Sequence, residues 1–175
     1  EGARGKEVNY SYKSGTITPE GNYYGFKSLN VGRYRGYQGV FVRKDLLDKW
    51  GLDVPTTIDD WDNLLKVAKE NGIKYPLTGT SKILGLSSIF FSTAWGINGD
   101  FYVEDGNVKY APFESEFKEY VKKMNEWYKN GYIDIDYVTN DNTIVNGYIT
   151  NGTSIAANCY VSNIGKLMDA MKERD

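Results

Sequence analysis

The sequence predicts an α/β domain with a mixed, mainly parallel sheet flanked by helices. A β-branched and aromatic run at residues 40–42 is typical of a buried strand, and apolar residues at helical spacing follow it at 44–50. An amphipathic helix at 58–70 then leads directly into a short apolar run at 73–77. This strand-helix-strand order is typical of parallel sheets, and 175 residues are enough for one hydrophobic core.

The boundary between the first two helices carries the most specific local signals. Gly51 ends the first helix because glycine adopts left-handed backbone at low steric cost, and Pro55 blocks its continuation. Thr57 and Asp60, three residues further on, resemble a capping box with Asp in place of the usual Glu or Gln. The second helix is therefore predicted to begin at about Ile58.

The remaining elements follow from periodicity and turn residues. Asp105 and Gly106 lie between two short apolar runs and predict a tight hairpin over residues 101–110. Apolar side chains at three- and four-residue spacing predict a helix over residues 114–129. The other predicted elements are a buried helix at 81–95, a short helix at 143–150, a strand at 153–157 and a final helix at 162–172.

Charge and residue types exclude several classes of function. The net charge of -2 comes from interspersed acidic and basic residues, so no electrostatic feature favours a nucleic-acid partner. The absence of histidine excludes Ser-His-Asp and Cys-His catalysis, and no nucleotide-binding or hydrolase motif occurs. The single cysteine, Cys159, excludes a disulfide within the chain and is predicted to be a small packed residue. The sequence therefore predicts neither an enzyme nor a cofactor.

Two nearby carboxylates invite a calcium interpretation. Asp134 and Asp136 match the first alternating positions of an EF-hand loop, which also needs a glycine at its sixth position and a glutamate at its twelfth. Those places hold Thr139 and Val145. No metal site is therefore predicted.

The edge of the predicted sheet offers a place for a ligand. Ligands of α/β sheets bind outside the carboxyl ends of the strands, which directs attention to the residues after Val42, Leu77 and Ala157. Two of these ends carry polar or aromatic residues, at 78–81 and 158–160. The chain also has 15 tyrosines and 4 tryptophans, whose large rings with a polar tip suit sugar faces and protein contacts.

Several segments, taken in order, resemble one protein family. They are GVFVRKDLLDKWGL and PTTIDDW, the hairpin FYVEDGNVKY, the helix and exit EFKEYVKKMNEWYKNGYIDIDY, and the strand NGTSIAANCY. Their shared order is similar to that of the extracellular solute-binding proteins of bacterial carbohydrate ABC transporters, the broad group that contains the maltose-binding protein. The resemblance covers most of the chain.

This resemblance implies one lobe of a type II periplasmic-binding-protein fold, in which two α/β lobes close on a sugar. It implies a single lobe at 1–175, with a crossover, hinge-proximal segment at 1–36 and the core at 37–175. The implied partners are a monosaccharide or oligosaccharide ligand and ABC permease subunits. The implied location is extracellular, either as a cell-surface lipoprotein or in the periplasm. Membrane attachment is expected only through a lipid anchor outside this piece of the chain.

The resemblance also implies site residues. Tyr160 falls where family members place an aromatic ring that stacks on sugar, and Trp95 falls at a packed position. A core tyrosine that caps the sheet is the alternative interpretation of Tyr160. The full set of candidate ligand-binding residues is Tyr160, Asn158, Tyr37, Gly36, Thr80 and Ser81.

A second function remains open from the sequence. Tyrosine-rich loops are also consistent with a stand-alone carbohydrate- or protein-binding surface module that has no transport role. Such a module should bind as it stands, whereas one lobe of a transporter protein should need its second half. Glu1 begins no signal peptide, so we expect that a targeting segment has been removed or that the chain is a piece of a longer protein.

Overall fold

A computed structural model describes residues 17–23, 38–81, 89–97 and 99–172. The chain divides into two compact units, residues 1–36 and 37–175. In the first unit, Ile17 pairs with Tyr23 in an antiparallel bridge across a tight turn. The role of 1–36 as a hinge-proximal segment stays a prediction. The candidate residues Gly36 and Tyr37 lie outside the described residues.

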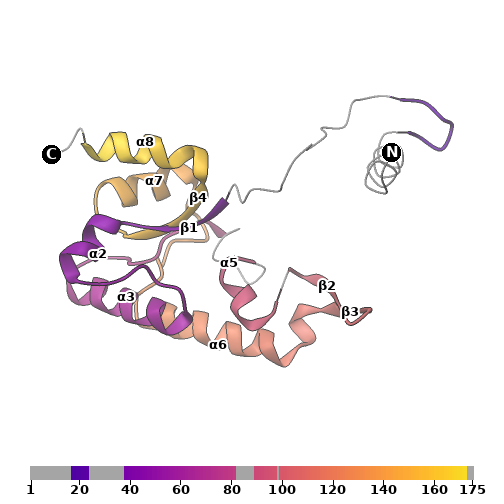
Figure 1. The fold of residues 1–175 in the computed structure, drawn as a ribbon, viewed down its shortest axis with the longest axis horizontal. Coiled ribbons are helices and arrows are strands. Elements are labelled where there is room, and N and C mark those ends of the chain that lie inside the picture. Colours follow the sequence, from indigo (N-terminus) through magenta and orange to yellow (C-terminus); the bar gives the residue numbers. More distant parts are fainter. Residues whose placement is uncertain (1–16, 24–37, 82–88, 98, 173–175) are drawn as a thin grey trace. The chain divides into compact units, whose positions relative to one another are not determined.

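The second unit contains the helices and strands (Figure 1). In chain order they are β1 (Gln38–Val42), α2 (Lys44–Trp50), α3 (Ile58–Glu70), α5 (Ile89–Ser92), a 3-10 turn (Thr93–Trp95), β2 (Phe101–Glu104), β3 (Asn107–Tyr110), a second 3-10 turn (Ala111–Phe113), α6 (Ser115–Lys129), α7 (Asn142–Thr150), β4 (Ala156–Tyr160) and α8 (Val161–Lys172). The predicted helices at 44–50, 58–70 and 114–129 and the hairpin are confirmed to within one residue. Of the predicted helix at 81–95, residues 82–88 lie outside the described residues.

The sheet is mixed, and its expected mainly parallel character is not confirmed. β1 pairs antiparallel with β4, from Gln38 opposite Tyr160 to Val42 opposite Ala156. Leu77 then forms single parallel bridges to Ala156 and to Ile133. Among the described residues the parallel pairings are therefore isolated bridges, whereas both ladders are antiparallel.

Two strands predicted from the sequence differ from the observed ones. The predicted strand at 73–77 pairs only at Leu77. The strand predicted at 153–157 begins three residues later, at Ala156. The Asn151 side chain accepts the backbone N–H of Thr153 at 2.9 Å, which keeps the chain in a turn after α7.

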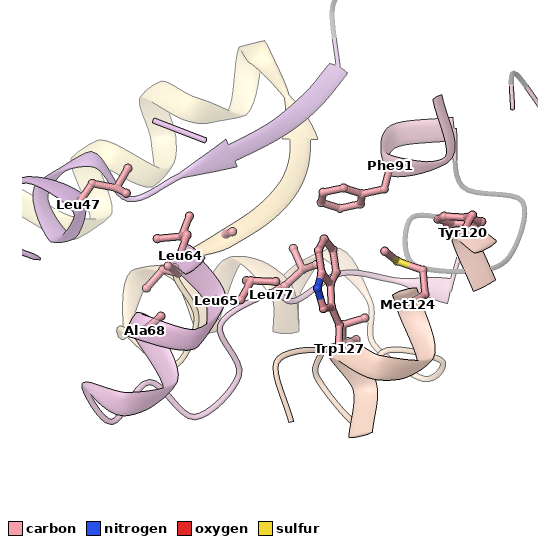
Figure 2. Packing of buried hydrophobic residues seen from close by; sticks show 12 residues of the cluster. Leu47, Leu64, Leu65, Ala68, Leu77, Phe91, Tyr120, Met124 and Trp127 are labelled. Carbon is pink, nitrogen blue, oxygen red and sulfur yellow. The ribbon is translucent and has the colours of Figure 1, made fainter. Parts of the chain in front are cut away.

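Helices cover the sheet on both sides. α7 and α8 lie against one face, while α3 and α6 lie on the other (Figure 1). The described residues form two hydrophobic cores, a larger and a smaller one, on opposite faces of the sheet. Neighbouring residues of a strand point to opposite faces, so Ala156 packs in the larger core and Ala157 in the smaller one. Figure 2 shows the larger core, in which α3, α5 and α6 pack around Leu65, Phe91 and Trp127. The smaller core consists of Val145, Ile149 and Ala157, with Phe41 packed against them.

The predicted capping box at the start of α3 is confirmed. The Thr57 hydroxyl accepts the Asp60 N–H at 3.1 Å, and the Asp60 carboxylate accepts the Thr57 N–H at 2.9 Å. The same carboxylate accepts the N–H and the hydroxyl of Thr56, each at 3.0 Å. Led by the Thr56 backbone N–H, these hydrogen bonds lower the pKa of Asp60 to about 2. Gly51, which ends α2, has the predicted left-handed backbone with φ of 67°.

This capping box makes a pH-dependent contribution to stability. Because the folded pKa of about 2 lies below the unfolded value of about 3.9, the contribution is complete above about pH 4 and is lost as the pH falls toward 2. Asp60→Asn should therefore lower the free energy of unfolding at pH 6 and have a smaller effect at pH 2.5, measured by urea denaturation. Asp59→Asn, on the same turn but outside the box, is the matched control. An equal Asp60→Asn effect at both pH values would contradict the prediction.

Candidate ligand-binding site

The strand directions define which residues share one edge of the sheet. Leu77 runs parallel to Ala156, so the segment after Leu77 and the end of β4 emerge at the same edge. β1 runs the other way, so its beginning lies there. We call this edge the strand-end face and define it by Gly39, Thr80, Ser81, Asn158 and Tyr160.

The prediction is therefore wrong for one of the three strand ends expected to meet a ligand. The residues after Val42 lie at the opposite edge, because Val42 pairs with Ala156 at the start of β4. Arg43 shows this directly. Its backbone N–H donates to the Ile155 carbonyl at 2.8 Å, and its guanidinium donates to the Ile149 carbonyl near the end of α7 at 3.2 Å.

Asn158 and Tyr160 lie on the same side of β4, two residues apart. Asn158 is 5% exposed, whereas Tyr160 is 47% exposed. Tyr160 therefore does not belong to the buried core. Between them, Cys159 is buried and points to the opposite side, as expected for a small packed residue, and burial raises the pKa of its thiol.

Thr80 and Ser81 follow the Leu77 bridge at the same edge. The Thr78 N–H donates to the Ala156 carbonyl at 3.0 Å, which holds the segment alongside β4. Gly79 is still buried, Thr80 is half-buried and Ser81 is exposed. The topology thus brings four of the six candidate residues to one edge. The other two, Gly36 and Tyr37, lie outside the described residues.

A pocket of about 500 Å³ opens between the start of β1, the start of α3 and α5. Val40 lines it and lies directly opposite Asn158 in the ladder, so the two side chains share one face of the sheet. The rings of Trp61 and Phe91 meet edge to face, with centroids 5.3 Å apart. The lining is aromatic and hydroxyl-bearing: Gly39, Val40, Pro55, Thr56, Thr57, Ile58, Trp61, Phe90, Phe91, Thr93 and Ala94.

The sequence did not single out this lining. Trp61 occupies a regular apolar position of α3, and Phe90 belongs to an apolar run, so both match the pattern of core residues. Only the position of α5 against the start of α3 turns these rings toward a shared space. No local sequence signal reports that contact.

Behind the strand-end face lies a buried carboxylate. Asp134 is fully buried, and its Oδ2 accepts from the Thr78 hydroxyl at 2.9 Å and from the Asn140 amide. Its Oδ1 accepts the Asp136 N–H at 3.0 Å. Within the described residues, no group of three or more His, Cys, Asp or Glu side chains could hold a metal ion. The sequence considered Asp134 only as a calcium ligand, although its place between two isoleucines is a signal for burial.

The sequence matches the profile of the bacterial extracellular solute-binding protein family over residues 7–166. The chain belongs to this family, and the resemblance found in the sequence is confirmed. The family consists of binding proteins rather than enzymes. Across the described part of the chain, no helix combines the length and the apolar character needed to cross a membrane.

Solved structures show the same fold. An HMO-binding, ABC-transporter-associated solute-binding protein from Bifidobacterium longum infantis has 21% identity and a TM-score of 0.68, over 95% of this chain and 39% of that one. The Streptococcus pneumoniae ABC-transporter substrate-binding protein FusA, in complex with kestose, has 24% identity and a TM-score of 0.68, over 91% and 36%. The alginate-binding protein AlgQ2 has 24% identity and a TM-score of 0.60, over 70% and 27%.

These similarities confirm the type II periplasmic-binding-protein class of fold. The present chain spans less than two fifths of the length of each of the three structures. No curated protein sequence matches this one.

Proposed function

We propose that this chain forms one lobe of an extracellular sugar-binding protein, which captures a carbohydrate between two lobes and delivers it to an ABC permease. The observation that carries the proposal is the aromatic and hydroxyl-lined pocket whose Val40 wall lies opposite Asn158 in the sheet. Family membership supports the same function. Two of the similar structures are of HMO-binding and alginate-binding proteins and the third is a complex with kestose, which supports a carbohydrate as the ligand class.

The chemistry of the pocket suits a sugar. A pyranose has an apolar face of C–H groups and a rim of hydroxyls, so it needs an aromatic ring together with polar side chains. Trp61, Phe90 and the half-exposed Tyr160 offer rings, while Thr56 and Thr93 offer hydroxyls. We assign Asn158, Tyr160, Thr80 and Ser81 to ligand contact, and the same role for Gly36 and Tyr37, which lie outside the described residues, stays a prediction.

The remaining parts of the proposal concern location and partners. The protein would act outside the cell, attached to the membrane only by a lipid anchor outside these residues or free in the periplasm. Its partners would be the sugar and the permease subunits. No nucleic acid, cofactor or catalytic role belongs to this proposal.

The first test is a sugar titration of the 175-residue chain, followed by NMR. One lobe supplies only part of the contacts, so we expect millimolar affinity, which corresponds to a binding free energy of only about 4 kcal/mol. A panel of neutral and acidic oligosaccharides that includes kestose should shift the amide signals of residues 56–61, 80–81 and 158–160. Signals from the outer side of α8 should stay unchanged and provide the internal control.

Two results would contradict the proposal. Tight, stoichiometric binding by these 175 residues would instead favour a stand-alone surface module. Signal changes confined to another region, such as the β2–β3 hairpin, would place the site elsewhere.

A further inference from the structure

The buried Asp134 carboxylate joins three segments of the chain immediately behind the strand-end face. One donor is the Thr78 hydroxyl at the end of the Leu77 segment, and the second is the Asn140 amide just before α7. The third is the backbone N–H of Asp136 in its own loop. Thr78 and Asp134 are fully buried, and Asn140 is 9% exposed. Such a carboxylate is costly to bury unless its oxygens are hydrogen-bonded, and here both oxygens are.

The network acts on the residues that lead to the proposed ligand contacts. The Asn140 amide also donates to the Gly79 carbonyl at 3.5 Å, so Asp134 and Asn140 hold both Thr78 and Gly79. In the described part of the chain, the last backbone hydrogen bond from this segment to β4 is that of Thr78. Beyond it, the position of Thr80 and Ser81 depends on how Gly79 is held.

We infer that Asp134 is a positioning residue of the ligand-binding site, which fixes the Gly79–Ser81 backbone at the strand-end face through Thr78 and Asn140. This inference rests on the proposed function, because it takes Thr80 and Ser81 as ligand contacts. It adds a residue that does not itself touch the sugar. Asp134 thereby contributes to affinity by holding the contact residues in place before the ligand arrives.

The geometry requires a carboxylate at this position. Oδ2 accepts two side-chain donors and Oδ1 accepts a backbone donor, so both oxygens must be acceptors. An amide has one oxygen and one NH2 group. In Asp134→Asn, at least one donor would therefore face another donor.

The test compares hydrogen exchange and sugar affinity in the same 175-residue variants. Asp134→Asn should speed exchange of the Thr78 amide, which donates to the Ala156 carbonyl, by about tenfold or more, the effect of one lost buried hydrogen bond, and weaken sugar binding in the folded protein. Thr78→Val removes only the hydroxyl and provides a milder variant if Asp134→Asn does not fold.

Ile149→Val is the matched control, because it removes one methyl group from the smaller core at the opposite edge. It should lower the melting temperature without a selective change in the exchange of the Thr78 amide or in sugar affinity. If Asp134→Asn and Thr78→Val behave like this control, Asp134 is purely structural and the inference is overturned. If Thr78 exchange becomes faster but sugar shifts the amide signals of another region of the unmodified chain, the proposed site fails instead and the ligand role of Asp134 fails with it.

Discussion

Replacing Trp127 with alanine is expected to lower the free energy of unfolding by about 3–5 kcal/mol, the usual cost of removing a large buried aromatic side chain. Trp127 is fully buried, and its ring meets that of Phe91 edge to face with centroids 5.3 Å apart (Figure 2). Its indole N–H donates to Asp62 on α3, so the residue joins α6 to both α3 and α5. A total stability of about 5–15 kcal/mol would leave this variant close to unfolding.

Urea denaturation followed by circular dichroism measures this loss. Trp127→Phe keeps an aromatic ring but removes the indole donor to Asp62. Because Asp62 keeps its ion pair with Lys123 at 2.8 Å, this variant should lose less free energy of unfolding than Trp127→Ala. Tyr128→Ala is the control on the next residue of α6, where the side chain is 41% exposed. A Trp127→Ala loss no larger than that of Tyr128→Ala would contradict the packing described for this core.

Replacing Tyr160 with alanine is expected to remove sugar binding with little change in stability. A central aromatic anchor commonly contributes about 2 kcal/mol or more to binding, which would take millimolar affinity beyond detection in the 175-residue chain. Because Tyr160 is 47% exposed, its truncation should change the free energy of unfolding by only about 0.5 kcal/mol. The melting temperature would then shift by no more than about 2 °C.

Calorimetry or NMR titration and a thermal melt on the same variant decide between the two roles of Tyr160. Tyr128→Ala again serves as control, because it removes a tyrosine of similar exposure from α6. It should leave sugar binding intact. A Tyr160→Ala protein that loses stability but keeps the affinity of its folded fraction would show a structural tyrosine instead.

The sequence predicted those parts of the fold that depend on nearby residues. Thr57 and Asp60 are three residues apart, and Gly51 adopts its left-handed backbone within its own turn, so both helix boundaries follow from local chemistry. The Asp105-Gly106 turn is equally local, with positive φ at both residues. For these elements, the residues that determine the local structure are the same residues that form the sequence signal.

The direction of β1 was not predictable in this way. Its partner, β4, follows more than a hundred residues later, and the strand-helix order alone gave no reason to prefer an antiparallel pairing. The error moved the end of β1 to the wrong edge of the sheet. Asp134 escaped notice for a similar reason, because Thr78 lies 56 residues away in the chain. The structure places Thr80, Ser81, Asn158 and Tyr160 at one edge of the sheet, and their contact with a ligand stays a prediction.

β4 changes from fully buried to half-exposed within five residues. Ala156 and Ala157 face the two cores, so a larger side chain at either would displace the helices packed there. Tyr160 is 47% exposed, so a different side chain at this position is less constrained by packing. A library of variants for altered sugar preference should therefore randomise position 160 and leave 156 and 157 as alanine. Substitutions at the end of this strand can change specificity without repacking of the two cores.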